Sequence, residues 1–100
     1  MENKAYLLIF DRDPTRDYEV LHNAIKNDRN IKNWWHYIKS AYLLITPLST
    51  IDLTHRIEGY MPSHRFLIFN VTGKMHNGRL PQEAWDWINK YIPVKKNTGF

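Results

Sequence analysis

Three aspartates lie close together near the N-terminus, at Asp11, Asp13 and Asp17. Carboxylate oxygens suit Mg²⁺ or Mn²⁺, and such ions activate water and steady phosphoryl oxygens in nuclease chemistry. Asp13 precedes Pro14 and fits the N-cap of a helix, and Asp17 fits a charge near the positive end of that helix dipole. Asp11 is therefore the candidate catalytic and metal-binding residue, unless it only pairs with a neighbouring arginine.

Basic side chains supply candidate contacts to an anion. Lys74, His76 and Arg79 lie in a loop just before a predicted C-terminal helix. Helix N-termini bind anions, so these three side chains could hold a phosphate, although they also fit an ordinary surface loop. Arg12 and Arg16, beside the acidic cluster, complete the basic candidates for ligand binding.

The composition excludes several kinds of site. The chain has no cysteine, so disulfides, zinc-thiolate sites and thiol catalysis are ruled out. The five histidines show no metal-ligand spacing, and the apolar runs are too short to span a membrane. The net charge of +4 favours anionic partners such as nucleic acid or a nucleotide. We expect a cytoplasmic protein without a membrane segment.

The pentapeptide AYLLI occurs twice, at 5–9 and at 41–45. Each copy lies in a short run that is apolar on both faces, which is typical of a central, buried strand. A similar run covers 65–71, and 34–38 predicts a further strand joined tightly to 41–46 at Lys39-Ser40. One long, bent strand over 34–46 is the alternative.

Three helices are predicted between and after these strands. The first follows Asp13-Pro14 and ends near Asn27. The second opens at Ser49, which with Asp52 resembles a capping box, and closes at Gly59. The third runs from Pro81 to about Tyr91 and turns a set of apolar residues inward. That set is Ala84, Trp85, Ile88 and Ile92.

The predicted order is strand, helix, two strands, helix, strand and a C-terminal helix. This order indicates an α+β fold of the ferredoxin-like βαββαβ type with an extra C-terminal helix. Its first and third strands, which carry the AYLLI copies, pair in the middle of the sheet. Residues 1–92 form one domain in this interpretation, and 93–100 form a basic, flexible tail.

Two helices cover only one face of a four-stranded sheet, so something else must cover the other. The third helix, a second protomer and a nucleic acid are the alternatives. Strand alternation sends Trp34 and His36 to one face and Trp35 and Tyr37 to the other. The tryptophans could therefore stack on bases, or pack against a partner subunit or the third helix. The chain lacks the signature of a standard RNA-recognition motif.

Several segments together resemble the SinR-like small bacterial proteins, which are relatives of the Cas-two subunit of CRISPR adaptation and of the VapD toxins. The resemblance covers most of the chain. It is carried by Phe10-Asp11, by Asp17-Tyr18 with Leu21 and Ala24-Ile25, and by the stretches WWHYIKSAYLLIT, FLIFNVTG and GRLPQEAWDWI.

The resemblance implies a ferredoxin-like homodimer packed through the open face of the sheet. It also implies that Asp11 matches the aspartate with which some Cas-two-type relatives, as metal-dependent nucleases, end the first strand. Ser40 matches a serine at the junction of the second and third strands. Other relatives act as scaffolds.

Two functional hypotheses follow. The first is a Cas-two-like homodimer that contacts nucleic acid, with Mg²⁺- or Mn²⁺-dependent nuclease activity at Asp11 as its catalytic form. The second is a non-catalytic module that binds a nucleotide, a signalling molecule or a protein partner.

Overall fold

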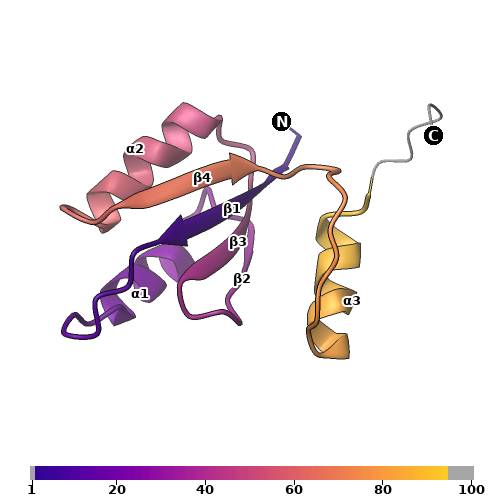
Figure 1. The fold of residues 1–100 in the computed structure, drawn as a ribbon. Coiled ribbons are helices and arrows are strands. Elements are labelled where there is room, and N and C mark those ends of the chain that lie inside the picture. The colour runs from indigo at the N-terminus through magenta and orange to yellow at the C-terminus, as the bar shows by residue number, and fades with distance from the viewer. Residues whose placement is uncertain (1, 95–100) are drawn as a thin grey trace.

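Four strands and three helices make up the computed structural model, which describes residues 2–94 (Figure 1). Their order along the chain is β1 (Lys4–Phe10), α1 (Glu19–Asn27), β2 (Asn33–Trp35), β3 (Ala41–Thr46), α2 (Thr50–Tyr60), β4 (Phe66–Asn70) and α3 (Gln82–Tyr91). The predicted order of elements and the α+β class are therefore confirmed.

The four strands form one antiparallel sheet in the order β2-β3-β1-β4. The two AYLLI copies pair with each other along their whole length, with Ala5 opposite Ile45 and Ile9 opposite Ala41. The predicted pairing of the first and third strands in the middle of the sheet is thus confirmed. This pairing lets both strands present apolar side chains to both faces.

Helices α1 and α2 lie together on one face of the sheet (Figure 1). That face supplies the main core, because Tyr6 and Leu8 of β1 and Leu44 of β3 are fully buried against the helices. Ile25 of α1 and Leu53 of α2 fill the other side of the same cluster. Each such buried side chain contributes about 1.5–3 kcal/mol relative to exposure.

The second face of the sheet is covered only at one end. There, Ile88 of α3 and Ile92, just after its last residue, pack against Ala5 and Ile45, and Figure 1 shows this helix set apart from the other two. Further along the same face, three large apolar side chains remain exposed. These are Ile9, Leu67 and Phe69.

The first helix begins later than predicted. We expected Asp13 to cap it, whereas α1 starts at Glu19 and residues 14–16 form a turn and a bend. The Asp13 carboxylate accepts hydrogen bonds from both the amide and the hydroxyl of Thr15. Such local bonds compete with helix capping, which explains the error. The Asp17 carboxylate instead accepts a hydrogen bond from the backbone amide of Glu19, at 2.9 Å.

The start of the second helix was predicted correctly and its end was not. Ser49 is the N-cap of α2 and accepts the amide of Asp52 at 3.1 Å. Gly59, expected to close the helix, lies inside its last turn, and the helix continues to Tyr60. The Tyr60 hydroxyl donates to the buried carboxylate of Asp28, and this contact fixes the last turn against α1.

The second strand is shorter than predicted. It spans Asn33–Trp35, because the chain leaves the ladder at His36 and turns where the Ala41 amide donates to the Ile38 carbonyl. The predicted turn at Lys39-Ser40 is correct, and the alternative of one long, bent strand is wrong. The strand predicted over 65–71 likewise spans Phe66–Asn70.

The third helix matches its prediction, with Pro81 at its N-cap and Ala84 and Ile88 buried. The tail predicted over 93–100 lies outside the described residues except for 93 and 94. Within residues 2–94, every helix is too short or too polar to cross a membrane.

Candidate functional site

Asp11 directly follows β1 at the surface, and its side chain pairs with that of Arg65, the residue before β4. Its backbone amide donates to the Arg65 carbonyl at 3.0 Å, which continues the ladder between the two strands. Both Nε and Nη2 of Arg65 donate to the same Asp11 carboxylate oxygen, at 3.0 and 2.7 Å. The arginine that pairs with Asp11 is therefore Arg65, and not one of its neighbours in the sequence, Arg12 and Arg16. Both side chains are well exposed, so the pair adds little to stability.

The surroundings of Asp11 in this chain do not fit a Mg²⁺ or Mn²⁺ site. Such ions take several oxygen ligands, whereas the one carboxylate here already faces a guanidinium. Within residues 2–94, no three His, Asp or Glu side chains gather closely enough to hold a metal ion. A metal at Asp11 would need further oxygen ligands from outside the described residues of this chain.

The other two acids of the cluster have local structural roles. Hydrogen bonds from the hydroxyl and amide of Thr15 lower the pKa of Asp13, and Arg16 adds a weaker contact at 3.6 Å. Asp17 holds the first turn of α1 through the Glu19 amide. The cluster thus separates into three independent sites.

Arg12 extends away from the Asp11–Arg65 pair. Its guanidinium lies over the Tyr18 ring, 4.7 Å from the centroid, and donates a long 3.4 Å bond to the Lys39 carbonyl. Arg12 therefore lies on the side of the sheet that carries α1. It spans from the end of β1 to the turn between β2 and β3.

A groove of about 400 Å³ opens beside Arg12, between the start of α1 and the β2–β3 turn. Its aromatic floor is built on Tyr42 of β3. The His36 ring stacks on the Tyr42 ring with centroids 4.0 Å apart and an interplanar angle of 11°. On the helix side, Nδ1 of His22 lies 3.0 Å from the Tyr42 hydroxyl. Burial raises the pKa of Tyr42 to about 12, so its phenol keeps its proton at neutral pH.

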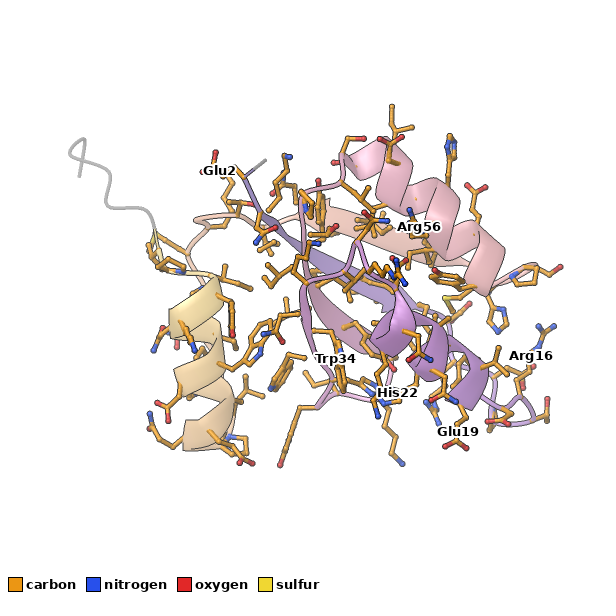
Figure 2. All side chains as sticks on the ribbon, turned by 180° about the vertical axis from the view of Figure 1, so that it is seen from behind. Glu2, Arg16, Glu19, His22, Trp34 and Arg56 are labelled. Atoms are coloured by element: carbon orange, nitrogen blue, oxygen red, sulfur yellow. The ribbon has the colours of Figure 1, made fainter. Side chains whose placement is uncertain are left out.

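The two candidate tryptophans lie on opposite faces of the sheet, as alternation predicted. Trp34 packs edge-on against His22 with centroids 4.8 Å apart, and Figure 2 shows these two side chains together. Trp34 thus adjoins the main core. Trp35, opposite Leu43, points to the other face and stacks on Tyr37 at 5.8 Å. Only Trp35 lies on the same face as the exposed apolar side chains.

The remaining candidates are spread over the molecule. Ser40 lies in the turn between β2 and β3, where its carbonyl accepts the Phe10 amide at 3.1 Å. Lys74 and His76 line a cavity of about 240 Å³ between the sheet and α3, and His76 stacks on Trp85 at 5.9 Å. Arg79 is exposed. The structure therefore does not join these residues to Asp11.

Sequence reasoning passed over the groove residues His22, His36 and Lys39 as functional candidates. One signal was available, because alternation already placed His36 on the same face as Trp34. The decisive contact could not be read from the sequence. It is the meeting of His22 from α1 with Tyr42 from β3, twenty residues further along the chain.

No protein-family model, curated protein or solved structure matches this chain.

Proposed function

We propose that this chain is a cytoplasmic, Cas-two-like protein with a ferredoxin-like fold that forms a homodimer and contacts nucleic acid. The sheet order β2-β3-β1-β4, with α1 and α2 on one face, supports the ferredoxin-like part of the proposal. The resemblance of its segments to the SinR-like and Cas-two proteins supports the functional part.

The observation that carries the homodimer is the uncovered apolar half of the sheet. Ile9, Leu67 and Phe69 are 40%, 53% and 50% exposed. They form one patch, because Ile9 lies opposite Leu67 and Leu7 lies opposite Phe69 in the β1–β4 ladder. Exposed contiguous apolar surface of this kind marks interaction sites. A two-fold dimer would bury the same patch on both copies.

Contact with nucleic acid is supported by the charged rim beside this patch. Arg65 and Asp11 flank the patch where β1 ends and β4 begins, and the Arg65 side chain is 90% exposed. Arg65 can therefore exchange its carboxylate partner for a phosphate at little cost. The net charge of +4 favours the same class of partner.

The homodimer is tested by light scattering on the native chain and on Leu67→Asp and Phe69→Asp. We expect a native dimer and monomeric variants, because a buried unpaired carboxylate is strongly unfavourable. Val20→Asp is the matched control, since Val20 is 68% exposed on α1, away from the patch. A native chain that is monomeric at micromolar concentration would contradict the homodimer.

Nucleic-acid contact is tested by titrating labelled single- and double-stranded DNA and RNA at two salt concentrations. We expect binding that weakens as salt rises, and a weaker affinity in Arg65→Ala. If a dimeric protein binds none of the four nucleic acids at low salt, the nucleic-acid part fails while the dimer stands.

If the proposed protein is catalytic, we expect it to be a nuclease. This activity requires the second protomer to supply oxygen ligands that one protomer lacks around Asp11. Mg²⁺- or Mn²⁺-dependent cleavage should then be lost in Asp11→Ala and retained in Asp86→Ala, which removes an exposed carboxylate on α3. Cleavage that survives in Asp11→Ala rejects this mechanism.

A non-catalytic binding module is the second candidate function. Lys74 and His76 line the apolar cavity between the sheet and α3, which supports a small ligand or a partner side chain at that position. A thermal-shift panel of nucleotides, repeated on His76→Ala, tests the small-ligand form. The absence of any shift in the native chain removes its support.

A further inference from the structure

The groove beside Arg12 is not used by either proposed function. It lies on the helix-covered side of the sheet, away from the exposed patch, and its volume of about 400 Å³ falls within the usual range for small-molecule sites. Its lining combines aromatic rings with charges of both signs. The lining residues are Phe10, Arg12, Asp17, Tyr18, Glu19, His22, His36, Lys39 and Tyr42.

The floor of the groove is held in place by contacts among its rings. His36 stacks on Tyr42, and its Nε2–H donates to the Lys39 carbonyl at 3.1 Å, because a carbonyl oxygen can only accept. His22 uses Nδ1 toward Tyr42, as described above. Tyr42 itself is only 1% exposed, so the rings that the floor presents to a ligand are the partly exposed imidazoles of His22 and His36. Each of these rings keeps one nitrogen that has no hydrogen-bond partner among residues 2–94.

The walls carry opposite charges that do not neutralise each other. Arg12 follows β1 and Lys39 lies in the β2–β3 turn, whereas Asp17 precedes α1 and Glu19 is the first residue of α1. Figure 2 shows Glu19 and His22 on the same helix. Among the described residues, none of these four side chains forms an ion pair with another. The groove thus suits a ligand with an anionic end and a hydrogen-bond-donating end.

We propose that this groove binds a nucleoside monophosphate, either free or as the phosphorylated end of an RNA strand. The phosphate lies against Arg12 and Lys39, whose charge-assisted hydrogen bonds are the strong ones. Ribose hydroxyls or base amino groups donate to Asp17 and Glu19. The base stacks on the aromatic lining, as bases do in single-strand binding proteins. This site is complete in one protomer and does not depend on the homodimer.

The test follows the ¹H–¹⁵N spectrum of the histidine rings while each of the four nucleoside monophosphates is added to the full chain. We expect the signals of His22 and His36 to shift, while the signal of His55, exposed on α2, stays in place. A shift confined to His76 would point instead to the cavity beside α3 and would overturn the proposal. No shift at millimolar nucleotide would also overturn it.

Two variants check the phosphate contacts. Arg12→Ala and Lys39→Ala should each weaken binding about tenfold or more, since each removes a charge-assisted contact. Both side chains are exposed, so the variants should fold. Arg29→Ala removes an exposed arginine in the turn after α1 and should bind like the native chain. Equal affinity in Arg12→Ala and Arg29→Ala would overturn the proposal.

Two further binding measurements distinguish a free nucleotide from an RNA strand end and test whether the base contributes to binding. Binding of an RNA hexamer only when it carries a terminal phosphate supports the strand end, and binding of mononucleotides alone supports the free form. Inorganic phosphate should bind much more weakly than either. If it shifts the same signals with the same affinity, the base contributes nothing and the nucleotide proposal fails.

Discussion

At the scale of single residues, Asp28 joins three segments through one buried carboxylate. One of its oxygens accepts the Tyr60 hydroxyl at 2.7 Å and faces Nε of Arg56 at 3.3 Å, and the other accepts the Asn30 amide at 2.9 Å. Only 2% of the Asp28 side chain is exposed. Arg56 comes from α2, where Figure 2 labels it. The carboxylate therefore connects the end of α1 to the last turns of α2.

Asp28→Ala should lower the free energy of unfolding by about 3 kcal/mol, because it leaves Arg56 and Tyr60 without the buried carboxylate to which they bond. This value is at the lower end of the usual range, since Arg56 is partly exposed and can rehydrate. Tyr60→Phe should cost about 1 kcal/mol for one lost hydrogen bond. Urea denaturation measures both. Asp86→Ala, at an exposed site, should stay within about 0.5 kcal/mol of the native chain.

The buried phenol of Tyr42 predicts a loss of stability at alkaline pH. Its pKa is raised to about 12 by burial, against about 10 in the unfolded chain. Below pH 10 both states keep the proton. Between pH 10 and 12 only the unfolded state loses it, so unfolding becomes easier by about 1.4 kcal/mol per pH unit. The contribution of Tyr42 to the free energy of unfolding is thus fully present below pH 10 and is lost as the pH approaches 12.

Urea denaturation at several pH values from 9 to 11.5, on the native chain and on Tyr42→Phe, checks this expectation. The native chain should lose more stability over that range than the variant. Tyr60, whose pKa burial also raises, is present in both proteins, so the difference between them reports on Tyr42. Parallel stability curves for the two proteins would show that Tyr42 does not contribute.

At the scale of elements, apolar patterning predicted which segments become strands and helices, and local side-chain bonds decided where they end. The AYLLI strands and α3 follow their predictions because their apolar periodicity is strong. The start of α1 does not, because Asp13 forms a turn with Thr15. A single sequence does not show which of two local hydrogen-bonding arrangements will form.

The cap of α2 gives a test at this scale. Ser49→Ala removes the acceptor for the Asp52 amide and should lower the free energy of unfolding by about 1 kcal/mol. Ser40→Ala is the matched control, because Ser40 contributes its backbone carbonyl rather than its hydroxyl to the described hydrogen bonds. Denaturation that shows equal stability for the two variants would mean that the cap is not used in solution.

At the scale of the whole molecule, the two faces of the sheet differ in how completely helices cover them. One face is closed by α1 and α2, and the other is closed by α3 only near Ala5 and Ile45. The Asp11–Arg65 pair borders the open half, whereas Arg12 belongs to the groove on the closed side. Asp11 and Arg12, although adjacent in the chain, thus lie on two different surfaces of the molecule.

The proposed homodimer predicts that the thermal midpoint rises with protein concentration, since association stabilises only the folded state. Differential scanning calorimetry over a hundredfold range of concentration should show this rise in the native chain. The midpoint of Phe69→Asp should be independent of concentration, and that of Val20→Asp should rise like the native one. A constant native midpoint would argue against a dimer over that range.

The sequence by itself determined the class of fold, the order of its elements and the central position of both AYLLI strands, because hydrophobic periodicity is a local property of the chain. It singled out Asp11 among the three aspartates, although the helix cap by which it set Asp13 aside was wrong, because Asp13 forms a turn with Thr15. Only the tertiary structure decided that Arg65 is the partner of Asp11 and that His22, His36 and Tyr42 meet in one groove. These contacts join residues from different strands and helices, so they depend on register and packing rather than on local spacing.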